Sequence, residues 1–421
     1  MKREPERGRP QRMRSTGFLA LGLVLIAAGL SRADTWKGRE LEQKWRSAAW
    51  RLGPLRIQPA IVLANAGIDS NGYYSPTEPV RDFTLTAGPA VDVYLPIYRK
   101  LILSAYGSPQ YVWYSKTKRE RTWNYYVKGS AALSLKRVFL SFDWKFSDAR
   151  ERWNTEVDIR PRRQEDGLGG TFLVQTSHRT SLAAGYREVK YDYENTSVET
   201  FNVRERLNRK ERYVDLTAYY QITSRTKFFV DGEYGTYDFE FAEASAMKDS
   251  RSRAVYGGLE FSTTGRLWGK ARLGYKKFDV RNAALSDYRG LVADVQVSVK
   301  AARPLVVRGN YSRDVDFSIW YANAYFLASK IGPGASLYLT RFMRLDYDYS
   351  IGRNRYPELE PDGGTGVKRL DDFRIHSAGL YFRIWKKTAI GIVASRWKRT
   401  SNLEYENDKR YFYGLNLTYD F

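Results

Sequence analysis

The side chains in this sequence that could act on a ligand are mostly basic, and many recur at every second position. In GRLWGKARLGYKK, Lys270 and Arg272 alternate with Leu267, Ala271 and Leu273. Basic side chains gathered on one face attract anions, because a ring of one charge selects ions of the opposite sign. The pattern therefore indicates electrostatic selection of a solute, and it requires elements that hold these side chains on a common face.

Covalent and metal chemistry have little support in the sequence. Cys is absent, which excludes disulfides, thiolate metal ligands and a Cys nucleophile. The two His residues are His178, in a predicted turn, and His376, which precedes Ser377. Adjacent residues of a strand point to opposite faces, so His376 and Ser377 cannot form a nucleophile–base pair. We expect no enzymatic activity, no cofactor and no metal site.

A period of two identifies the elements that carry these residues as strands. VFLSFDWKF sends Leu140, Phe142 and Trp144 to one face and Asp143 and Lys145 to the other. The sequence contains eighteen such segments, and sixteen strands is the alternative because the patterns near 171–175 and 323–330 are weak. The predicted strands lie near residues 56–65, 82–95, 101–113, 122–134, 137–147, 170–177, 180–193, 212–221, 226–240, 252–262, 266–280, 290–299, 304–316, 321–339, 343–353, 372–384, 388–400 and 409–421.

The connections between these strands alternate between short turns and longer loops. Leu135-Lys136-Arg137 is one of the short turns, whereas NTSVETFNVRERLNRKER is one of the long, charged loops. Transmembrane β-barrels have short turns at the periplasmic rim and long loops at the extracellular rim. We therefore predict an all-β, antiparallel up-and-down transmembrane barrel over residues 54–421.

Composition agrees with a barrel that has one apolar and one polar face. Of the 421 residues, 43% are hydrophobic and 15% aromatic, yet the mean hydropathy is −0.54 and the net charge is +22. A closed sheet satisfies every backbone hydrogen bond in hydrocarbon, which an open sheet cannot do. A soluble β-sandwich or propeller would also alternate, but it would not explain the one-sided loop lengths or the N-terminal segment described next.

The N-terminus has the pattern of a secretory signal. A basic stretch that includes Lys2, Arg3 and Arg7 precedes the uncharged run from Gly17 to Leu30, and Ser31-Arg32-Ala33 offers a cleavage site. The run is shorter than the roughly 20 apolar residues that span a membrane as a helix. We predict a cleaved signal peptide over residues 1–33 and a short periplasmic leader over residues 34–53. The leader is either disordered or a short helix that docks at the barrel mouth or on a partner.

The last segment, YFYGLNLTYDF, places aromatic and leucine side chains on one face and Asn416, Thr418 and Asp420 on the other. It resembles the C-terminal signature of outer-membrane proteins, in which a terminal Phe after alternating apolar residues is read by the barrel-assembly machinery. The residues expected to form this assembly signal are Tyr413, Leu415, Leu417, Tyr419 and Phe421.

Several segments resemble one family in particular. FFVDGEYGTYDF, YRGLVADVQVSV and RPLVVRGNYSRDVDFS, with GPLRIQPAIVLANAGIDSNGYY at the start, are similar to the putative β-barrel porin 2 family. The resemblance implies an outer-membrane barrel with a porin-like role or a role linked to exopolysaccharide or capsule export. The opening loop of that family tends to be acidic, whereas IDSNGYY keeps only Asp69.

Two groups of charged residues are candidate functional features. The first is a lumen lining that acts either as an anion filter or as a cross-strand network of opposite charges that stiffens the barrel; its main members are Lys128, Lys270, Arg272, Arg308, Arg344 and Asp346. The second is a set of basic residues in the predicted outer loops, namely Arg160, Arg162, Arg163, Arg204, Arg206 and Arg209. These residues are either solvated or in contact with phosphates of lipopolysaccharide or with an acidic polysaccharide, and a nucleic-acid partner is not expected.

The sequence thus predicts a channel in the outer membrane of a Gram-negative cell for passive diffusion of small solutes, with anions as the candidate class. Membrane lipid and lipopolysaccharide are expected to surround it. A component of exopolysaccharide or capsule export is one alternative. A structural barrel with an occluded lumen is the other.

Overall fold

The computed structural model describes residues 36–72, 79–98, 100–152, 156, 159–198, 201–261, 266–362, 365–385, 387–403 and 406–420. The predicted signal peptide lies outside these residues and stays a prediction.

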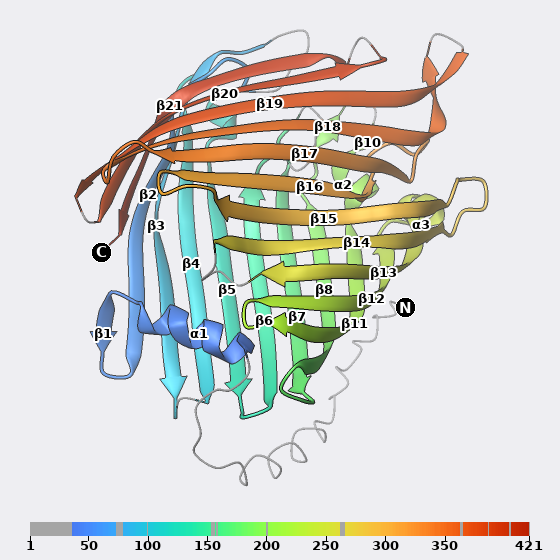
Figure 1. The fold of residues 1–421 in the computed structure, drawn as a ribbon. Helices are drawn as coiled ribbons and strands as arrows, with labels where there is room; N and C mark the ends of the chain where they lie inside the picture. Colours follow the sequence, from blue (N-terminus) through green and yellow to red (C-terminus); the bar gives the residue numbers. More distant parts are fainter. Residues whose placement is uncertain are drawn as a thin grey trace, which may run out of the picture.

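Eighteen long antiparallel strands form one closed ring (Figure 1). A nineteenth strand, β1 (Trp50–Leu52), pairs only with the start of β2. The prediction of eighteen strands is therefore confirmed. The strands of the ring are β2 (Leu55–Asp69), β3 (Asp82–Ile97), β4 (Leu101–Tyr114), β5 (Thr122–Ser134), β6 (Val138–Arg150), β7 (Arg162–Gln175), β8 (Thr180–Tyr193), β11 (Arg209–Thr223), β12 (Thr226–Phe239), β13 (Ser250–Phe261), β14 (Leu267–Val280), β15 (Tyr288–Lys300), β16 (Leu305–Phe317), β17 (Tyr325–Tyr338), β18 (Met343–Asp362), β19 (Thr365–Trp385), β20 (Thr388–Ser401) and β21 (Asp408–Asp420).

The ring closes where the first long strand, β2, pairs with the last, β21. Leu63 lies opposite Leu417 in this seam, and the register shifts at a bulge beyond it. Asn65 occupies the bulge with φ of 52° and donates its backbone N–H to the side chain of Asn416 at 2.9 Å. Asn tolerates this left-handed conformation better than most residues. Gly67 follows, where a Cβ would overlap the carbonyl oxygen of Tyr413.

The outer surface of the ring is apolar along its middle. Leu273 is 58% exposed, and Tyr413 on the last strand is 59% exposed. Their neighbours in sequence, Arg272 and Phe412, face the interior and are partly or fully buried. The predicted assignment of the two faces is therefore confirmed for these strands, as period-two geometry requires.

Several strands continue beyond the predicted ends at the long-loop rim. β7 begins at Arg162, so Arg162 and Arg163 pair with β6 and are not loop residues as predicted. Arg209 likewise begins β11 and lies opposite Phe239. The hairpin of β18 and β19 also includes most of residues 354–371, which lie between the predicted strands 343–353 and 372–384 and are predicted as a long loop. Outside hydrocarbon a strand needs no apolar face, so the ladder extends through charged residues that resemble a loop in sequence.

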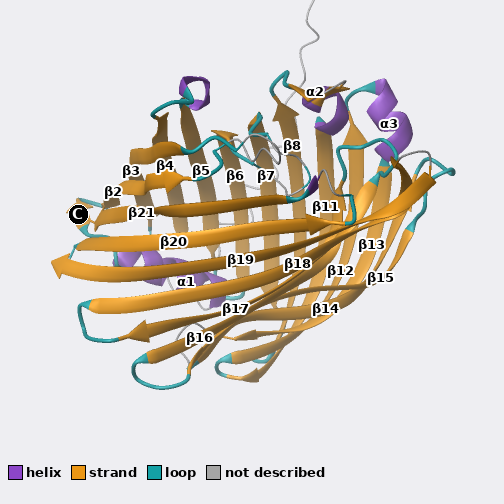
Figure 2. Cartoon of the chain, turned by 90° about the horizontal axis from the view of Figure 1, so that it is seen from above, coloured by secondary structure: helices purple, strands orange, loops and turns teal. Residues whose placement is uncertain are grey.

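The short-turn rim and the long-loop rim each carry short helices. α1 (Trp36–Arg46) lies inside the ring near the short turns, as Figures 1 and 2 show together. The opposite rim carries η1 (Lys118–Glu120), α2 (Val203–Leu207), α3 (Ala242–Lys248) and the small hairpin of β9 (Ser197–Val198) and β10 (Phe201–Asn202). No helix in the described part of the chain is long and apolar enough to cross a membrane.

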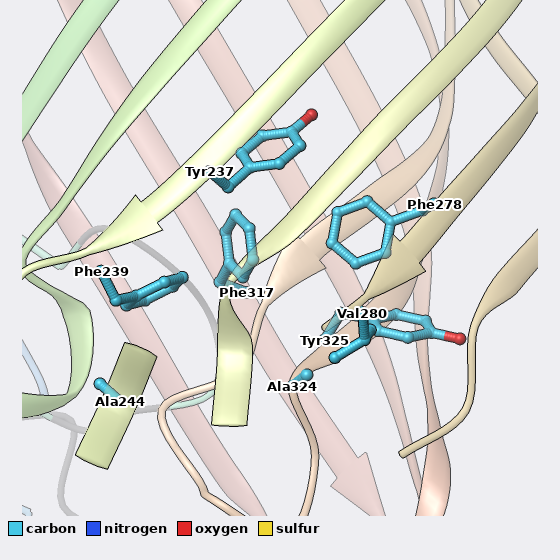
Figure 3. Close-up of a cluster of buried hydrophobic side chains, with 8 residues drawn as sticks. All are labelled: Tyr237, Phe239, Ala244, Phe278, Val280, Phe317, Ala324 and Tyr325. Carbon is cyan, nitrogen blue, oxygen red and sulfur yellow. The ribbon is translucent and has the colours of Figure 1, made fainter. Parts of the chain in front are cut away.

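The long-loop end of the interior is packed with aromatic side chains. Tyr237, Phe239, Phe278, Phe317 and Tyr325 point toward one another from four strands (Figure 3). The Phe317 ring lies 5.1 Å from that of Phe239 and 5.2 Å from that of Tyr237, both edge-to-face. This cluster lies on the inner side of β12, β14, β16 and β17, near the outer rim.

We expect substitution of an outward side chain by Arg to destabilise the barrel far more than the same substitution on the inner face. Leu273→Arg places a charge against hydrocarbon and should cost roughly 2–4 kcal/mol of folding free energy. Gln296→Arg on the adjacent strand is the matched control, because Gln296 faces the interior with Lys270. Reversible folding into lipid vesicles measures both; equal losses would contradict the assignment of faces.

Candidate functional site

The predicted lumen-lining residues of the C-terminal strands face the interior, but each basic group has a partner. The Arg272 guanidinium lies 4.0 Å from the Asp231 carboxylate and 3.6 Å from that of Asp294. It also lies over the Tyr256 ring, 4.5 Å from its centroid. Arg272 is therefore held between the strands on either side of it.

Arg308 on β16 and Arg344 on β18 also pair with carboxylates. Arg308 pairs with Asp348 at 2.9 Å, and Arg344 pairs with Asp346 at 2.9 Å. Arg344 also lies 4.8 Å from the centroid of the Tyr381 ring. Of the two alternatives from the sequence, these contacts favour the network of opposite charges.

Lys128 and Lys270 contact aromatic rings instead of carboxylates. The Lys270 ammonium lies 4.6 Å from the centroid of the Phe229 ring, and that of Lys128 lies 5.6 Å from the Tyr106 ring. Lys128 is on β5, remote in the ring from the strands that carry the other five predicted residues. The six residues therefore do not form one ring of like charge.

The inner end of the lumen, near the short turns, holds helix α1. Leu41 packs against a cluster of Ala132, Phe139, Leu173 and Ala183 on the inner faces of β5 to β8. Of the two alternatives for residues 34–53, a disordered leader or a helix at the mouth, the structure has the helix over Trp36–Arg46.

Charged residues of α1 interact with opposite walls of the barrel. Lys37 lies within electrostatic reach of Glu260 and Asp215, on β13 and β11. Lys44 acts on Asp92 of β3. Beyond the helix, the Ala49 N–H donates to the Gln58 side chain at 2.9 Å. The helix thus crosses the inner mouth and is held at both of its ends.

At the outer end, Arg152 and Glu156 of the connection between β6 and β7 contact distant parts of the rim. The Arg152 guanidinium lies 4.7 Å from the centroid of the Trp397 ring on β20. Glu156 accepts hydrogen bonds from the Ser318 hydroxyl and, at 2.7 Å, from the Ile319 N–H. Residues 318 and 319 follow β16, which lies almost diametrically opposite β6 in the ring. This connection therefore joins distant parts of the outer rim.

The buried side chain of Lys248 also contacts residue 318, which Glu156 binds at the outer mouth. Lys248, at the end of α3, donates to the Ser318 carbonyl at 2.6 Å and to the Arg206 carbonyl at 3.4 Å. Burial lowers the pKa of Lys248 to about 7, although the nearby carboxylate of Glu156 opposes the shift. Burial raises the pKa of Glu156 to about 7, against the attraction of Arg369 and Lys248. Both groups therefore carry less charge at neutral pH than they would in water.

Between this connection and the wall formed by β2 to β5, β20 and β21 lies a polar cavity of about 400 Å³, here called the outer chamber. Its lining includes Gln110, Tyr114, Asn124, Tyr126, Arg160 and Arg410. Arg410 is held by the buried carboxylate of Asp69, with Nε to Oδ1 at 2.8 Å. None of the described residues that line the chamber comes from β12, β14, β16 or β17, which carry the aromatic cluster.

The basic residues predicted in the outer loops mostly contact the protein itself. Arg160 lies over the Tyr114 ring, Arg204 over the Phe241 ring and Arg206 over the Tyr321 ring. Arg209 is buried and pairs with Glu211 at 2.7 Å. Arg162 pairs with Asp148 at 2.6 Å, and Arg163 lies 3.4 Å from Glu165. Their contact with lipopolysaccharide or polysaccharide stays a prediction.

On the last strand, Tyr413 and Leu415 are exposed on the outer surface and share a face with Leu417 and Tyr419. Phe421 lies outside the described residues. Their recognition by the barrel-assembly machinery stays a prediction.

Sequence reasoning missed Glu156, Lys248 and the outer chamber. Glu156 and Lys248 lie in charged segments whose composition is that of solvated loops. A Glu in ERWNTE gives no local signal that it will be buried, because its partners are distant in sequence.

A closed antiparallel ring with an apolar outer surface, a polar inner face and long loops at one rim defines a transmembrane β-barrel of the outer membrane. Residues 47–421 match the sequence model of a family described as putative beta-barrel porin 2, and the chain belongs to that family. The predicted family and outer-membrane location are therefore confirmed. No curated protein sequence matches the chain significantly.

Several solved structures are similar in fold. The outer membrane protein opdK from Pseudomonas aeruginosa is 11% identical with a TM-score of 0.49, and the similarity covers 87% of this chain and 98% of that one. A BenF-like porin from Pseudomonas fluorescens is 11% identical with a TM-score of 0.48, and the similarity covers 88% of this chain and 99% of that one. The siderophore receptor PirA from Acinetobacter baumannii is 9% identical with a TM-score of 0.44, and the similarity covers 87% of this chain and 80% of that one. The family assignment rests on the sequence match alone.

We predict that acidification strengthens the closure at the outer mouth. The pKa of Glu156 is about 7 when the carboxyl is buried and near the ordinary 4.5 when it is exposed, so the closed arrangement binds the proton more tightly. The closed arrangement therefore becomes more stable, relative to the open one, as the pH falls from about 7 toward 4.5. It becomes less stable as the pH rises through the same range. Lys248 titrates between its lowered value of about 7 and 10.5, outside this window.

Hydrogen exchange of the Ile319 amide, corrected for its intrinsic pH dependence, measures this closure. Protection should be greater at pH 5 than at pH 7. Glu156→Gln keeps an acceptor and removes the titration, so its protection should not vary over the same range. A wild-type protein with equal protection at both pH values would refute the prediction.

Proposed function

We propose that this barrel is a channel for passive diffusion of small hydrophilic solutes across the outer membrane, with a preference for anions, and that it is not an enzyme. The observation that carries the proposal is the combination of a closed ring with a charged inner face and a polar outer chamber. Membership of a porin family supports it. Size would be the first filter, because α1 and the β6–β7 connection both narrow the path.

In this proposal the paired charges of the wall shape the electric field along the path. Each Arg–Asp pair presents a positive and a negative end to a passing ion, so selectivity depends on the balance of the pairs more than on one residue. Arg272, Arg308, Arg344 and Asp346 act as members of this network, and Lys128 and Lys270 add positive charge to the wall.

The alternative of an occluded structural barrel is favoured by one observation, the contacts of α1 and of Glu156 across the two mouths. A role in exopolysaccharide or capsule export ranks lower, because a sugar chain would require both elements to move aside. Single-channel conductance in planar bilayers separates the channel from the occluded barrel.

We expect deletion of residues 36–46 to raise the single-channel conductance several-fold, because α1 occupies the inner mouth. The matched control is Leu52→Ala, an exposed change on β1 that lies outside the helix. If neither the wild type nor the deletion variant conducts, the channel proposal fails. Conduction by the deletion variant alone would identify α1 as a plug.

Neutralising four lining residues should shift ion preference toward cations. The variant Lys270→Gln, Arg272→Gln, Arg308→Gln, Arg344→Gln leaves Asp231, Asp294, Asp346 and Asp348 without these partners, so the wall becomes more negative. Reversal potentials in a salt gradient measure the change. Arg251→Gln with Arg253→Gln, both exposed, is the control. Unchanged potentials in the fourfold variant would exclude these residues from selectivity.

A further inference from the structure

We propose that the outer chamber is a binding site for a small carboxylated sugar, and that the Arg160 guanidinium binds its carboxylate. This proposal rests on the proposed channel function and names a solute class for it.

Three of the basic residues around the chamber have carboxylate partners. Arg150 pairs with Glu194 at 2.7 Å, and Arg410 pairs with Asp69. Among the described residues that line the chamber, Glu151 is the one carboxylate, and it lies 3.7 Å from Arg163. The negative charges near the chamber are therefore already offset by basic groups, which makes the site unsuited to a cation.

Arg160 differs from these residues. No carboxylate of the described residues lies within ion-pairing distance of its guanidinium, which is half-buried. Nη1 donates to the Tyr114 hydroxyl, and Nη2 donates to the Arg150 carbonyl at 3.0 Å. A guanidinium has five N–H donors in a planar fork, so donors remain that no described protein acceptor takes.

The position of Arg160 is fixed before any ligand arrives. Its guanidinium lies 5.1 Å from the centroid of the Tyr114 ring, and Tyr114 is buried at the end of β4. Tyr114 is therefore a positioning residue for Arg160. A fixed planar fork suits a carboxylate, which accepts two parallel hydrogen bonds. Fixing it in advance reduces the ordering cost of binding.

The remaining lining indicates what the carboxylate is attached to. Gln110, Asn124 and Tyr126 offer neutral donors and acceptors, which suit hydroxyl groups better than an apolar body. The cavity of about 400 Å³ lies within the usual range for small-molecule sites and is too small for a long chain. A monosaccharide acid combines these features.

The test is equilibrium binding of sodium glucuronate to the purified, folded full chain in detergent, by saturation-transfer NMR, with glucose as the neutral comparison. We expect glucuronate to bind and glucose to bind at least tenfold more weakly. Arg160→Gln should weaken glucuronate binding about tenfold or more, since charge-assisted hydrogen bonds are lost. Arg160→Lys should retain part of the affinity, because the charge remains without the fork.

Arg162→Gln is the matched control, because Arg162 is two positions away and pairs with Asp148 outside the chamber. It should bind glucuronate like the wild type. If Arg160→Gln does not fold, Tyr114→Phe tests the same site by removing the hydroxyl that holds Arg160, and should weaken binding of glucuronate without affecting glucose.

Equal binding of glucuronate by the wild type and Arg160→Gln, equal binding of glucose and glucuronate, or no binding by the wild type would each overturn the site. Conductance of the same preparation is measured separately. A protein that conducts without binding glucuronate retains the channel function and loses this site, whereas one that binds without conducting retains the site and loses the channel.

Discussion

The structure depends on one constraint, that every backbone N–H and C=O group in hydrocarbon must find a partner within the protein. A sheet meets this condition only if its first and last strands pair. The fold therefore depends on the pairing of β2 with β21, which closes the ring. The need for this pairing accounts for two unusual residues of the seam. Asn65 adopts a left-handed bulge there, and Gly67 leaves room for the Tyr413 carbonyl.

Closure creates an interior that is neither a hydrophobic core nor bulk water. Charged side chains on the inner face are partly removed from solvent, and an isolated charge in such a place is costly. Pairs such as Arg308 with Asp348 reduce that cost and connect β16 with β18 across the intervening β17. Aromatic rings add to this stabilisation, as the Phe229 ring does for the Lys270 ammonium. Arg160 stands apart because its charge is oriented by Tyr114 without being neutralised.

The two mouths are narrowed by different physical means. At the inner mouth, α1 docks through Leu41 on apolar side chains and through long-range attraction of its charged groups to the walls. At the outer mouth, the contact of Glu156 with Ser318 and Ile319 is a buried hydrogen-bonded arrangement beside Lys248. The docking of α1 relies mainly on apolar contacts, whereas the contact of Glu156 depends on protonation of its carboxyl. A change of pH should therefore affect the outer mouth more than the inner one.

The sequence by itself determined the strands, the faces they expose and the closure of the ring, and it favoured eighteen strands over sixteen. Those features follow from local alternation and from the demands of hydrocarbon, which act on each segment separately. It misplaced the outer strand ends at Arg162, Arg163 and Arg209, since charged residues in water are equally compatible with strands and loops.

Only the tertiary structure decided what lies inside the ring. Glu156 meets Ile319 across 163 positions of sequence, and α1 finds its place on side chains from four strands. No local pattern records such contacts, because their free energy depends on which distant residues the closed ring brings within a few ångströms of each other.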